Sequence, residues 1–454
     1  MDTPAPAPLA ASAPAPALVF PGARARSPAL LQGRRHVPGQ LSGTAVLCLV
    51  FLPYALGHYL SCMLRTVNAV LAPHLAGAAG LMPAELGLLT SAYFLAFALA
   101  QLPVGIALDR YGPRLVQCAL LLLAALGTLG FALSNDFAQM LCARMVMGLG
   151  LAGCFMAAVK AISTWVAPAR LPSVQGYLIA AGGLGAASST LPVQVLVQHV
   201  DWRWLFAMLA LCCVAAAMLV LRLAPTPPAA PRKAQRQPVG KAIGEVFRYP
   251  AFRETAGLVL VPHTVFFGIQ GLWIGRWLTD VGGYSASGVA WLLYLGMGAV
   301  IFGAIAVGKL TEWAARRGVD ALTVAAMGVL LFVLVQVGFV LGWQPCYPVL
   351  AVLFTLVGTV TGIEYTIVAQ AMPPALTGRA STCLNLLIFT GAFAVQAGFG
   401  MIVGLWQPDA AQRYPAGAYQ SAFLVLVLLQ LPGIACFCWR RRRLLPANTV
   451  ESQL

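Results

Sequence analysis

Charged residues are scarce in this chain, and acidic residues are the scarcest. Only 9% of its 454 residues are charged, and Asp and Glu together number 13. An average soluble domain is about 25% charged. Because 60% of the residues are hydrophobic, the chain has too little polar surface for a soluble globular fold, and that class is excluded.

Catalytic, metal and cofactor signatures are also missing from the sequence. None of the 11 cysteines forms a Cys-x-x-Cys pair, and no glycine-rich loop is followed by the Lys-Ser/Thr that binds phosphate. The pairs Cys212-Cys213 and Cys436-x-Cys438 are interpreted as small packing residues. We therefore expect a protein that is not an enzyme and that uses no metal and no cofactor.

Long apolar segments are what the sequence has in abundance. Each is long enough for a helix to cross a hydrocarbon core of ~30 Å. Strands of a membrane barrel would alternate over ~10 residues, whereas these segments are continuous. The sequence therefore predicts an all-α membrane protein with twelve transmembrane helices, at residues 44–73, 84–108, 113–134, 137–164, 172–197, 203–223, 255–278, 286–310, 320–342, 347–370, 381–406 and 420–439.

Basic residues gather at one set of helix ends. Of the 28 lysines and arginines, only Arg203 and Arg413 fall in loops on the opposite side. The positive-inside rule makes the crowded side cytoplasmic and puts both termini there. Such placement fits a lipid bilayer as partner and argues against nucleic acid. We expect a monomeric, multi-pass protein of a bacterial inner (plasma) membrane.

The long basic loop at residues 224–253 divides the chain into two parts of six predicted helices each, 41–223 and 254–440. The segments before the first half and after the second half are expected to be cytoplasmic tails. Residues 1–40, rich in Ala and Pro, cannot bury enough apolar surface to become ordered. An organelle transit peptide is the alternative for this segment. The second tail, 441–454, begins within the arginine run 440–443, which is interpreted as an anchor to anionic lipid.

A charged turn lies between the second and third predicted helices, with the sequence Gly105-Ile-Ala-Leu-Asp109-Arg110-Tyr-Gly112-Pro-Arg114. Its spacing resembles the signature loop of the major facilitator superfamily of membrane transporters. Gly105 would let a neighbouring helix come close. Asp109 would accept hydrogen bonds at a helix N-terminus, and Arg110 and Arg114 would pair with it or contact the cytoplasmic surface. The alternative is an ordinary charged hairpin between two membrane helices.

A second copy of this motif stands at the same place in the second half, in the sequence Gly308-Lys-Leu-Thr-Glu312-Trp-Ala-Ala-Arg316. Internal repeats of this kind are typical of secondary transporters. The resemblance implies the fold of the superfamily: two pseudo-symmetric six-helix halves that rock around a site at the middle of the membrane. It also implies that helices 1, 4, 7 and 10 line the cavity.

Two arginines lie deep in predicted helices, Arg65 in helix 1 and Arg144 in helix 4. A charge at this depth costs about 2.5–3.5 kcal/mol, so each requires a wet cavity or a partner. Two guanidiniums, whose planar forks suit oxyanions, predict an anionic substrate. Pairing of either arginine with backbone carbonyls or with Glu364 is the structural alternative.

The segment around Arg65 resembles the first helix of the anion:cation symporter branch, in which an Asp-Arg pair precedes an Asn. Here Leu64 replaces the acid and Asn68 supplies the amide. Arg144 with Gly148 matches the helix-4 pattern of that branch, without the acid that some members carry further along. The glycine-rich helices 4 and 5 resemble nitrate/nitrite-type carriers.

Because those acids are missing, other residues are the candidate proton carriers: Glu364, His58 and His263. Glu364 lies within a predicted span and could bind a proton on one side of the membrane and release it on the other; a static ion pair is the alternative. A histidine can switch charge near neutral pH, although a lone histidine on an apolar helix more often serves packing.

Further candidates for substrate binding lie in helices that can reach the cavity: Tyr59, Asn68, Gln270, Trp273 and Tyr365. For the aromatic residues, packing or an interfacial belt is the alternative. Together these features favour a secondary transporter of a small organic carboxylate or inorganic oxyanion, coupled to protons. An efflux antiporter for drugs or metabolites is a second hypothesis. A non-transporting receptor or scaffold on the same fold is a third.

Overall fold

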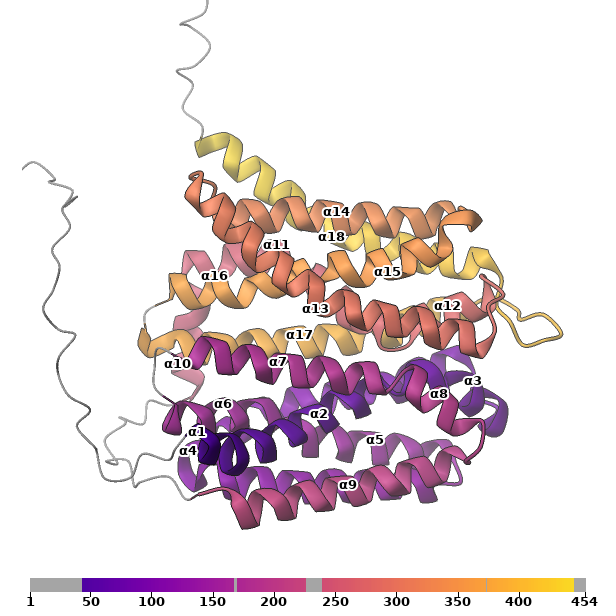
Figure 1. Ribbon diagram of the computed structural model, residues 1–454. Coiled ribbons are helices and arrows are strands. Elements are labelled where there is room, and N and C mark those ends of the chain that lie inside the picture. The colour runs from indigo at the N-terminus through magenta and orange to yellow at the C-terminus, as the bar shows by residue number, and fades with distance from the viewer. Residues whose placement is uncertain (1–42, 167–169, 226–238, 373, 445–454) are drawn as a thin grey trace, which may run out of the picture. The chain divides into compact units, whose positions relative to one another are not determined.

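The computed structural model describes residues 43–166, 170–225, 239–372 and 374–444. Within these ranges the chain is helical and contains no strand (Figure 1). The predicted tail at 1–40, the centre of the predicted linker and residues 445–454 lie outside the described residues, so the predictions for them stay untested. Residues 41–454 form one compact unit.

The first half is built from helices that run back and forth across the unit. Its first span changes from α1 through a π-helical turn, η1, into α2 and α3, and two further spans are interrupted between α5 and α6 and between α7 and α8. The elements are α1 (Gly43–Val46), η1 (Leu47–Phe51), α2 (Leu52–Thr66), α3 (Asn68–Ala79), α4 (Pro83–Leu133), α5 (Phe137–Leu151), α6 (Cys154–Trp165), α7 (Leu171–Ser188), α8 (Leu191–Val197) and α9 (Trp202–Leu223).

Helix α4 is two membrane spans in succession. Its 51 residues would extend ~77 Å at 1.5 Å per residue, more than twice a hydrocarbon core. The backbone leaves the helical conformation at Gly112, where φ is 79° and ψ is 165°. Gly112 tolerates this left-handed φ because it lacks a Cβ. The charged turn predicted from the sequence is therefore present.

The second half contains the elements α10 (Val239–Arg248), α11 (Pro250–Gln270), α12 (Trp273–Asp280), α13 (Ala286–Arg316), α14 (Ala321–Leu341), η3 (Gln344–Cys346), α15 (Tyr347–Gly358), η4 (Thr359–Gly362), α16 (Ile363–Ala371), α17 (Pro374–Val403) and α18 (Ala416–Leu444). Helix α10 lies inside the segment expected to be a linker. Its Val246 is fully buried in a cluster with Phe252 and Leu384, so tertiary packing holds this short helix in place.

Ten helices of the described chain are long and apolar enough to span a membrane, and α11 with α12, bent by 56°, forms an eleventh. Counting α4 as two spans gives the twelve predicted from the sequence. The all-α fold of membrane helices is confirmed.

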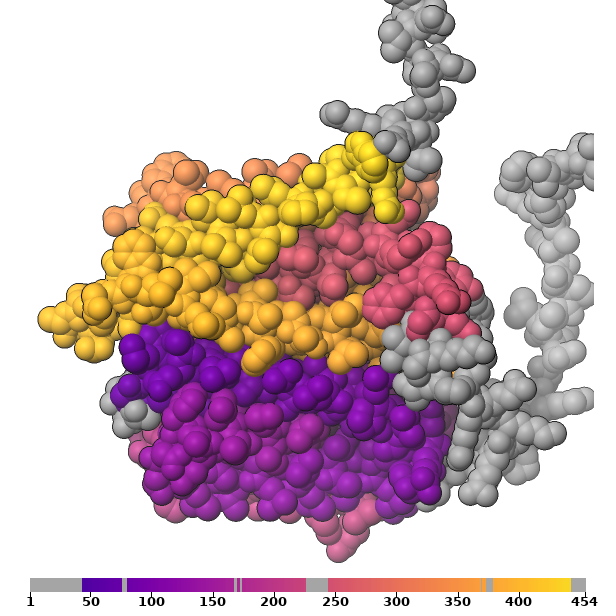
Figure 2. All heavy atoms as spheres, turned by 180° about the vertical axis from the view of Figure 1, so that it is seen from behind, coloured from indigo at the N-terminus to yellow at the C-terminus, as the bar shows by residue number. Residues whose placement is uncertain are grey.

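The two halves meet along a few helix pairs. Helix α17 packs along α4, α12 packs on α3, and α13 packs on α7 and α8; Figure 2 shows the orange surface of α17 against the indigo and purple surface of the first half. At the α3–α12 contact a Cβ on Gly275 would lie 2.7 Å from the carbonyl oxygen of Ala69. The halves are thus closely packed at this end of the unit.

Candidate functional site

Arg65 lies where the two halves face each other. Its guanidinium is 5.1 Å from the ring centroid of Phe267 on α11, in the other half, and its Nη2 is 3.6 Å from Sγ of Cys62 on its own helix. The side chain is half-buried. Among the ion pairs of the described residues, none includes Arg65. A cationic group without a carboxylate partner therefore faces the boundary between the halves.

His263 and Glu364 form a buried pair in the second half. Nδ1 of His263 on α11 is 2.6 Å from Oε1 of Glu364 on α16, and the two residues are 3% and 0% exposed. Oε2 of Glu364 has no hydrogen-bond partner within the described structure. Of the three predicted proton carriers, the structure brings these two together, and Glu364 pairs with a histidine instead of an arginine.

Phe267 connects this pair to Arg65. One turn along α11 from His263, its ring is stacked with the imidazole at a centroid distance of 5.0 Å and an interplanar angle of 19°. The same ring contacts the Arg65 guanidinium. A continuous line of side chains therefore runs from Glu364 through His263 and Phe267 to Arg65.

A hydrogen-bond chain crosses the boundary beside this line. The hydroxyl of Tyr365 donates to Oδ1 of Asn385, and Nδ2 of Asn385 donates to Oε1 of Gln101 at 3.4 Å. Nε2 of Gln101 donates to the carbonyl of Ala152 at 3.4 Å, in the interruption between α5 and α6. Sequence reasoning missed Gln101. The available signal was an amide inside an apolar helix, where polar groups usually have a partner.

Arg144 is enclosed within the first half. It is 1% exposed, donates from Nη1 to the carbonyl of Leu64 at 3.0 Å, and lies over the rings of Phe131 and Phe206 at 5.1 and 5.9 Å. Nε and Nη2, which form the edge that grips a carboxylate with two parallel hydrogen bonds, have no partner within the described structure. Its predicted role in substrate binding stays a prediction.

His58, the third predicted proton carrier, lies on α2 and belongs to a different cluster. Nε2 of His58 is 3.8 Å from Sγ of Cys62, and its ring centroid is 5.0 Å from that of Phe155 on α6. Neighbouring Tyr59 is half-buried, and its carbonyl would lie 2.2 Å from a Cβ on Gly185 of α7. This face of α2 is thus occupied by close helix packing.

The other predicted substrate residues are buried. Nδ2 of Asn68 donates to Oγ1 of Thr90 at 3.1 Å, and Nε1 of Trp273 donates to the carbonyl of Gln396 at 3.0 Å. Gln270 is 8% exposed, with Nε2 at 3.9 Å from Sδ of Met297. In this conformation the three side chains contact protein, and their predicted contact with substrate is untested.

Asp109 in the charged turn pairs with Lys160, which lies five residues before the end of α6. Oδ1 of Asp109 is 2.6 Å from Nζ of Lys160, which also donates to the carbonyl of Leu108 at 2.8 Å. The expectation that Asp109 accepts hydrogen bonds at a helix N-terminus is therefore wrong, because its carboxylate accepts from the side chain of a lysine in the second half of α6. The Asp109 side chain is 83% exposed.

The remaining residues of the turn have separate environments. Arg114 donates to the carbonyl of Leu221 at the end of α9, and the Arg110 guanidinium lies 5.1 Å from the ring centroid of Tyr111. A Cβ on Gly105 would have no neighbouring atom within 4 Å. The expectation that Gly105 permits close helix approach is wrong, because no described helix packs against it.

The second copy of the motif repeats the backbone turn but not the ion pair. Gly318, two residues after the end of α13, has a positive φ of 77°, as Gly112 has one of 79° in the first half. Glu312 is exposed and takes part in none of the ion pairs of the described chain. Arg316 ends α13, and a Cβ on Gly308 would have open space around it. The internal repeat is therefore one of backbone geometry.

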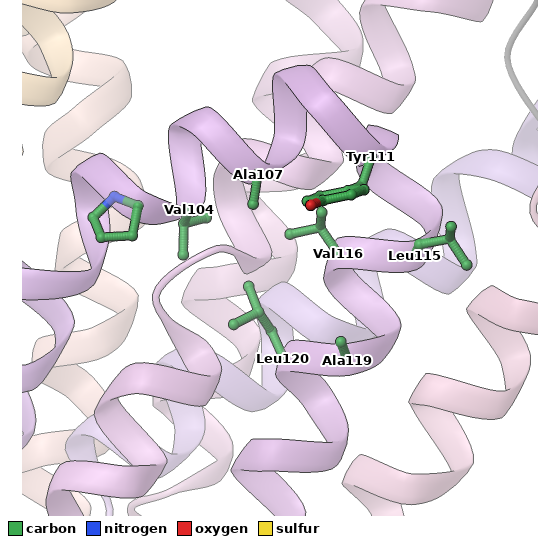
Figure 3. A pocket seen from close by; sticks show the side chains of 8 residues that line it. Val104, Ala107, Tyr111, Leu115, Val116, Ala119 and Leu120 are labelled. Carbon is green, nitrogen blue, oxygen red and sulfur yellow. The ribbon is translucent and has the colours of Figure 1, made fainter. Parts of the chain in front are cut away.

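A groove of about 450 Å³ lies between the two arms of α4 beside the charged turn (Figure 3). Its lining is apolar apart from the hydroxyl of one tyrosine, with side chains from Pro103, Val104, Ala107, Tyr111, Leu115, Val116, Ala119 and Leu120. Such a lining offers almost no polar group to orient an anion, so the candidate site remains the line from Arg65 to Glu364.

Comparison with known proteins supplies a family and a set of relatives. A sequence model described as Major Facilitator Superfamily matches residues 54–396. The chain is 32% identical over 127 residues to a probable L-galactonate transporter of Escherichia coli, covering 28% of each chain. It is 28% identical over 164 residues to a probable sulfoacetate transporter of Cupriavidus necator, covering 36% of each. It is 32% identical over 97 residues to a nitrate/nitrite transporter of Nostoc punctiforme, covering 21% of this chain and 19% of that one. The chain thus matches little more than a third, at most, of the length of these relatives.

Two solved structures share the fold. A bacterial homolog of the human lysosomal transporter Spinster, inward-facing and unoccupied, superimposes with a TM-score of 0.71 at 17% identity, covering 88% of this chain and 98% of that one. A D-xylose–proton symporter gives a TM-score of 0.62 at 12% identity, covering 86% and 96%. At these identities the likeness concerns the arrangement of the helices.

Proposed function

The chain belongs to the major facilitator superfamily, and from that premise we propose that it is a secondary transporter of a small anion, either an organic carboxylate or an inorganic oxyanion, coupled to protons. The observation that carries the proposal is the position of Arg65, half-buried at the boundary between the halves and in contact with Phe267 across it. A charge within a membrane span is costly, so this guanidinium needs a polar environment or an anion.

The chemistry of Arg65 favours an anion of this size. A guanidinium presents a planar fork that matches carboxylates and other oxyanions, and none of the ion pairs in the described ranges neutralises it. The relatives support this class by their names: galactonate, sulfoacetate, nitrate and nitrite are all anions. Arg144, with two buried donors unpartnered, is the second group that can bind an oxyanion when the halves separate.

Proton coupling rests on the buried pair of His263 and Glu364. A proton that enters the pair neutralises the Glu364 carboxylate and leaves a hydrogen-bonded neutral pair, which is easier to bury than a charge. Phe267 contacts both His263 and Arg65, so a shift of Arg65 on anion binding moves the wall of the proton site. This contact is the physical basis we propose for coupling the two events.

Transport proceeds by rocking of the halves around this line of residues. The end at α3 and α12 is closely packed. The opposite end, which carries the charged turn of α4 and the arginine run at the end of α18, is here called the arginine-rich end (Figure 1). Access in this conformation is proposed from that end. Following the positive-inside rule, we place that end in the cytoplasm.

Uptake into proteoliposomes tests the function. Radiolabelled gluconate, acetate and nitrate, tested one at a time, should reveal an anion that accumulates when the lumen is alkaline. If none of a broad set of carboxylates and oxyanions is transported while a cationic drug is, the antiporter hypothesis replaces this one. Accumulation that does not depend on the pH gradient would contradict proton coupling and would still support anion transport. A ligand that binds the folded protein should also raise its melting temperature.

A further inference from the structure

A second cavity of about 260 Å³ lies at the arginine-rich end of the second half, away from the line from Arg65 to Glu364. It is enclosed by the first turns of α11, the start of α14 and the last turns of α18. In Figure 2 the rose surface of α10 and α11 is visible between the yellow of α18 and the orange of α17. The helices α11 and α18 cross closely at its base, because a Cβ on Gly433 would lie 2.4 Å from the carbonyl oxygen of Gly257.

The cavity has an apolar floor and a cationic rim. Leu258, Leu322 and Phe437 contribute apolar surface. Arg440 and Arg441 stand at the rim on the last turns of α18. The two kinds of surface therefore lie within one small cavity.

Part of the rim charge is already neutralised. Nη1 of Arg440 is 3.3 Å from Oε1 of Glu254, and Nη1 of Arg441 is 2.7 Å from Oδ2 of Asp320. Arg253 also lines the cavity, is exposed, and belongs to none of the ion pairs among the described residues. It stands in the first turn of α11, where the helix dipole adds partial positive charge. One positive charge of the rim thus remains available for an anion.

We propose that this cavity binds an anionic phospholipid, with the phosphate at Arg253 and Arg440 and an acyl chain against Leu258 and Phe437. The three helices are membrane spans or the ends of spans, so the rim lies where lipid head groups lie and the floor where acyl chains begin. A soluble phosphate would use the rim but leave the apolar floor exposed. The combination of floor and rim therefore favours a lipid.

Native mass spectrometry of the full-length protein in detergent tests this site with phosphatidylglycerol as probe. Arg253→Ala should weaken binding of the first phosphatidylglycerol about fivefold, because one basic residue near an anionic lipid surface contributes about 1 kcal/mol. Arg170→Ala, which removes an exposed arginine at the start of α7 in the other half, is the matched control and should leave this affinity unchanged. Because Arg253 takes part in none of the ion pairs among the described residues, the variant is expected to fold.

A second variant distinguishes a lipid from a soluble anion. Cys436→Trp places a large ring in the cavity while retaining every arginine, and it should reduce phosphatidylglycerol binding by blocking the acyl chain. Excess inorganic phosphate should not displace the lipid. The proposal is overturned if Arg253→Ala binds phosphatidylglycerol as tightly as Arg170→Ala does. It is also overturned if Cys436→Trp has no effect, if phosphate displaces the lipid, or if phosphatidylcholine binds equally well.

Discussion

His263 and Glu364 are joined by a 2.6 Å contact between Nδ1 and Oε1 across α11 and α16, although 101 residues separate them in the chain. Phe267 stacks on the histidine and also contacts Arg65. A titratable pair and a candidate anion-binding guanidinium are thus separated by one aromatic ring. Because of this arrangement, the proposed coupling between proton binding and anion binding can be tested by mutation.

Glu364→Gln should uncouple transport from protons. Glutamine retains a hydrogen-bonding oxygen opposite His263 but cannot take up or release a proton in the physiological pH range. We expect loss of accumulation driven by a pH gradient, while exchange of labelled for unlabelled anion at equal pH continues. Glu312→Gln, which changes an exposed acid at the end of α13, is the control. Undiminished accumulation by Glu364→Gln would show that the pair is a static structural contact.

Arg65→Ala should weaken anion binding at least about 30-fold. Removing one partner of a buried charge pair costs at least about 2 kcal/mol, equivalent to about 30-fold in dissociation constant. Arg65→Lys keeps the charge but not the planar fork, so we expect intermediate affinity. Isothermal titration calorimetry with the transported anion measures both.

Arg144→Met separates the roles of the two arginines, since it removes a buried guanidinium with two unpartnered donors. If Arg144 binds the anion, this variant loses affinity without a lower melting temperature. Normal affinity in Arg144→Met would make that arginine structural, and normal affinity in Arg65→Ala would overturn the proposed site.

Asp109→Asn should change the rate of transport more than the affinity. The Asp109–Lys160 ion pair fixes the turn in α4 to the end of α6, away from the residues around Arg65. An exposed ion pair contributes about 1 kcal/mol or less to stability, so the melting temperature should change little. Stopped-flow uptake gives the rate and equilibrium binding gives the affinity.

Lys160→Ala and the double variant Asp109→Asn/Lys160→Ala should slow transport as much as Asp109→Asn does if the two residues act only through their ion pair. A variant of Asp109 with normal rate and weaker binding would contradict this role.

Gly112→Ala should destabilise the protein. The backbone at this position, with φ of 79° and ψ of 165°, lies in a region that is essentially restricted to glycine and costs a residue with a Cβ about 1–3 kcal/mol. Gly105→Ala is the matched control seven residues earlier: it lies in a helix, and its Cβ would meet no atom within 4 Å. We expect this control to be neutral or slightly stabilising, because alanine is the better helix former. Thermal unfolding in detergent measures both. Equal melting temperatures would show that the turn relaxes at no cost.

The composition and the hydrophobic runs predicted the membrane class and the number of spans, and the charged motif predicted the turn at Gly112, because these depend on local transfer free energies and local backbone preferences. The same reasoning missed α10, whose ten residues lie in a basic segment. A helix of this length is stable only when its apolar face packs on other elements, and those elements are distant in sequence.

Which side chains pair with Glu364 and Asp109 was decided by the tertiary structure alone. The sequence suggested an arginine as the partner of Glu364, whereas helix packing gives it His263. The sequence predicted a helix N-terminus as the partner of Asp109, whereas packing places Lys160 beside it. Apolar spans carry little information about which face meets which neighbour, because lipid and protein interior are similarly apolar. The helices therefore follow from the sequence directly, whereas the pairs that we propose carry function follow from how the helices are assembled.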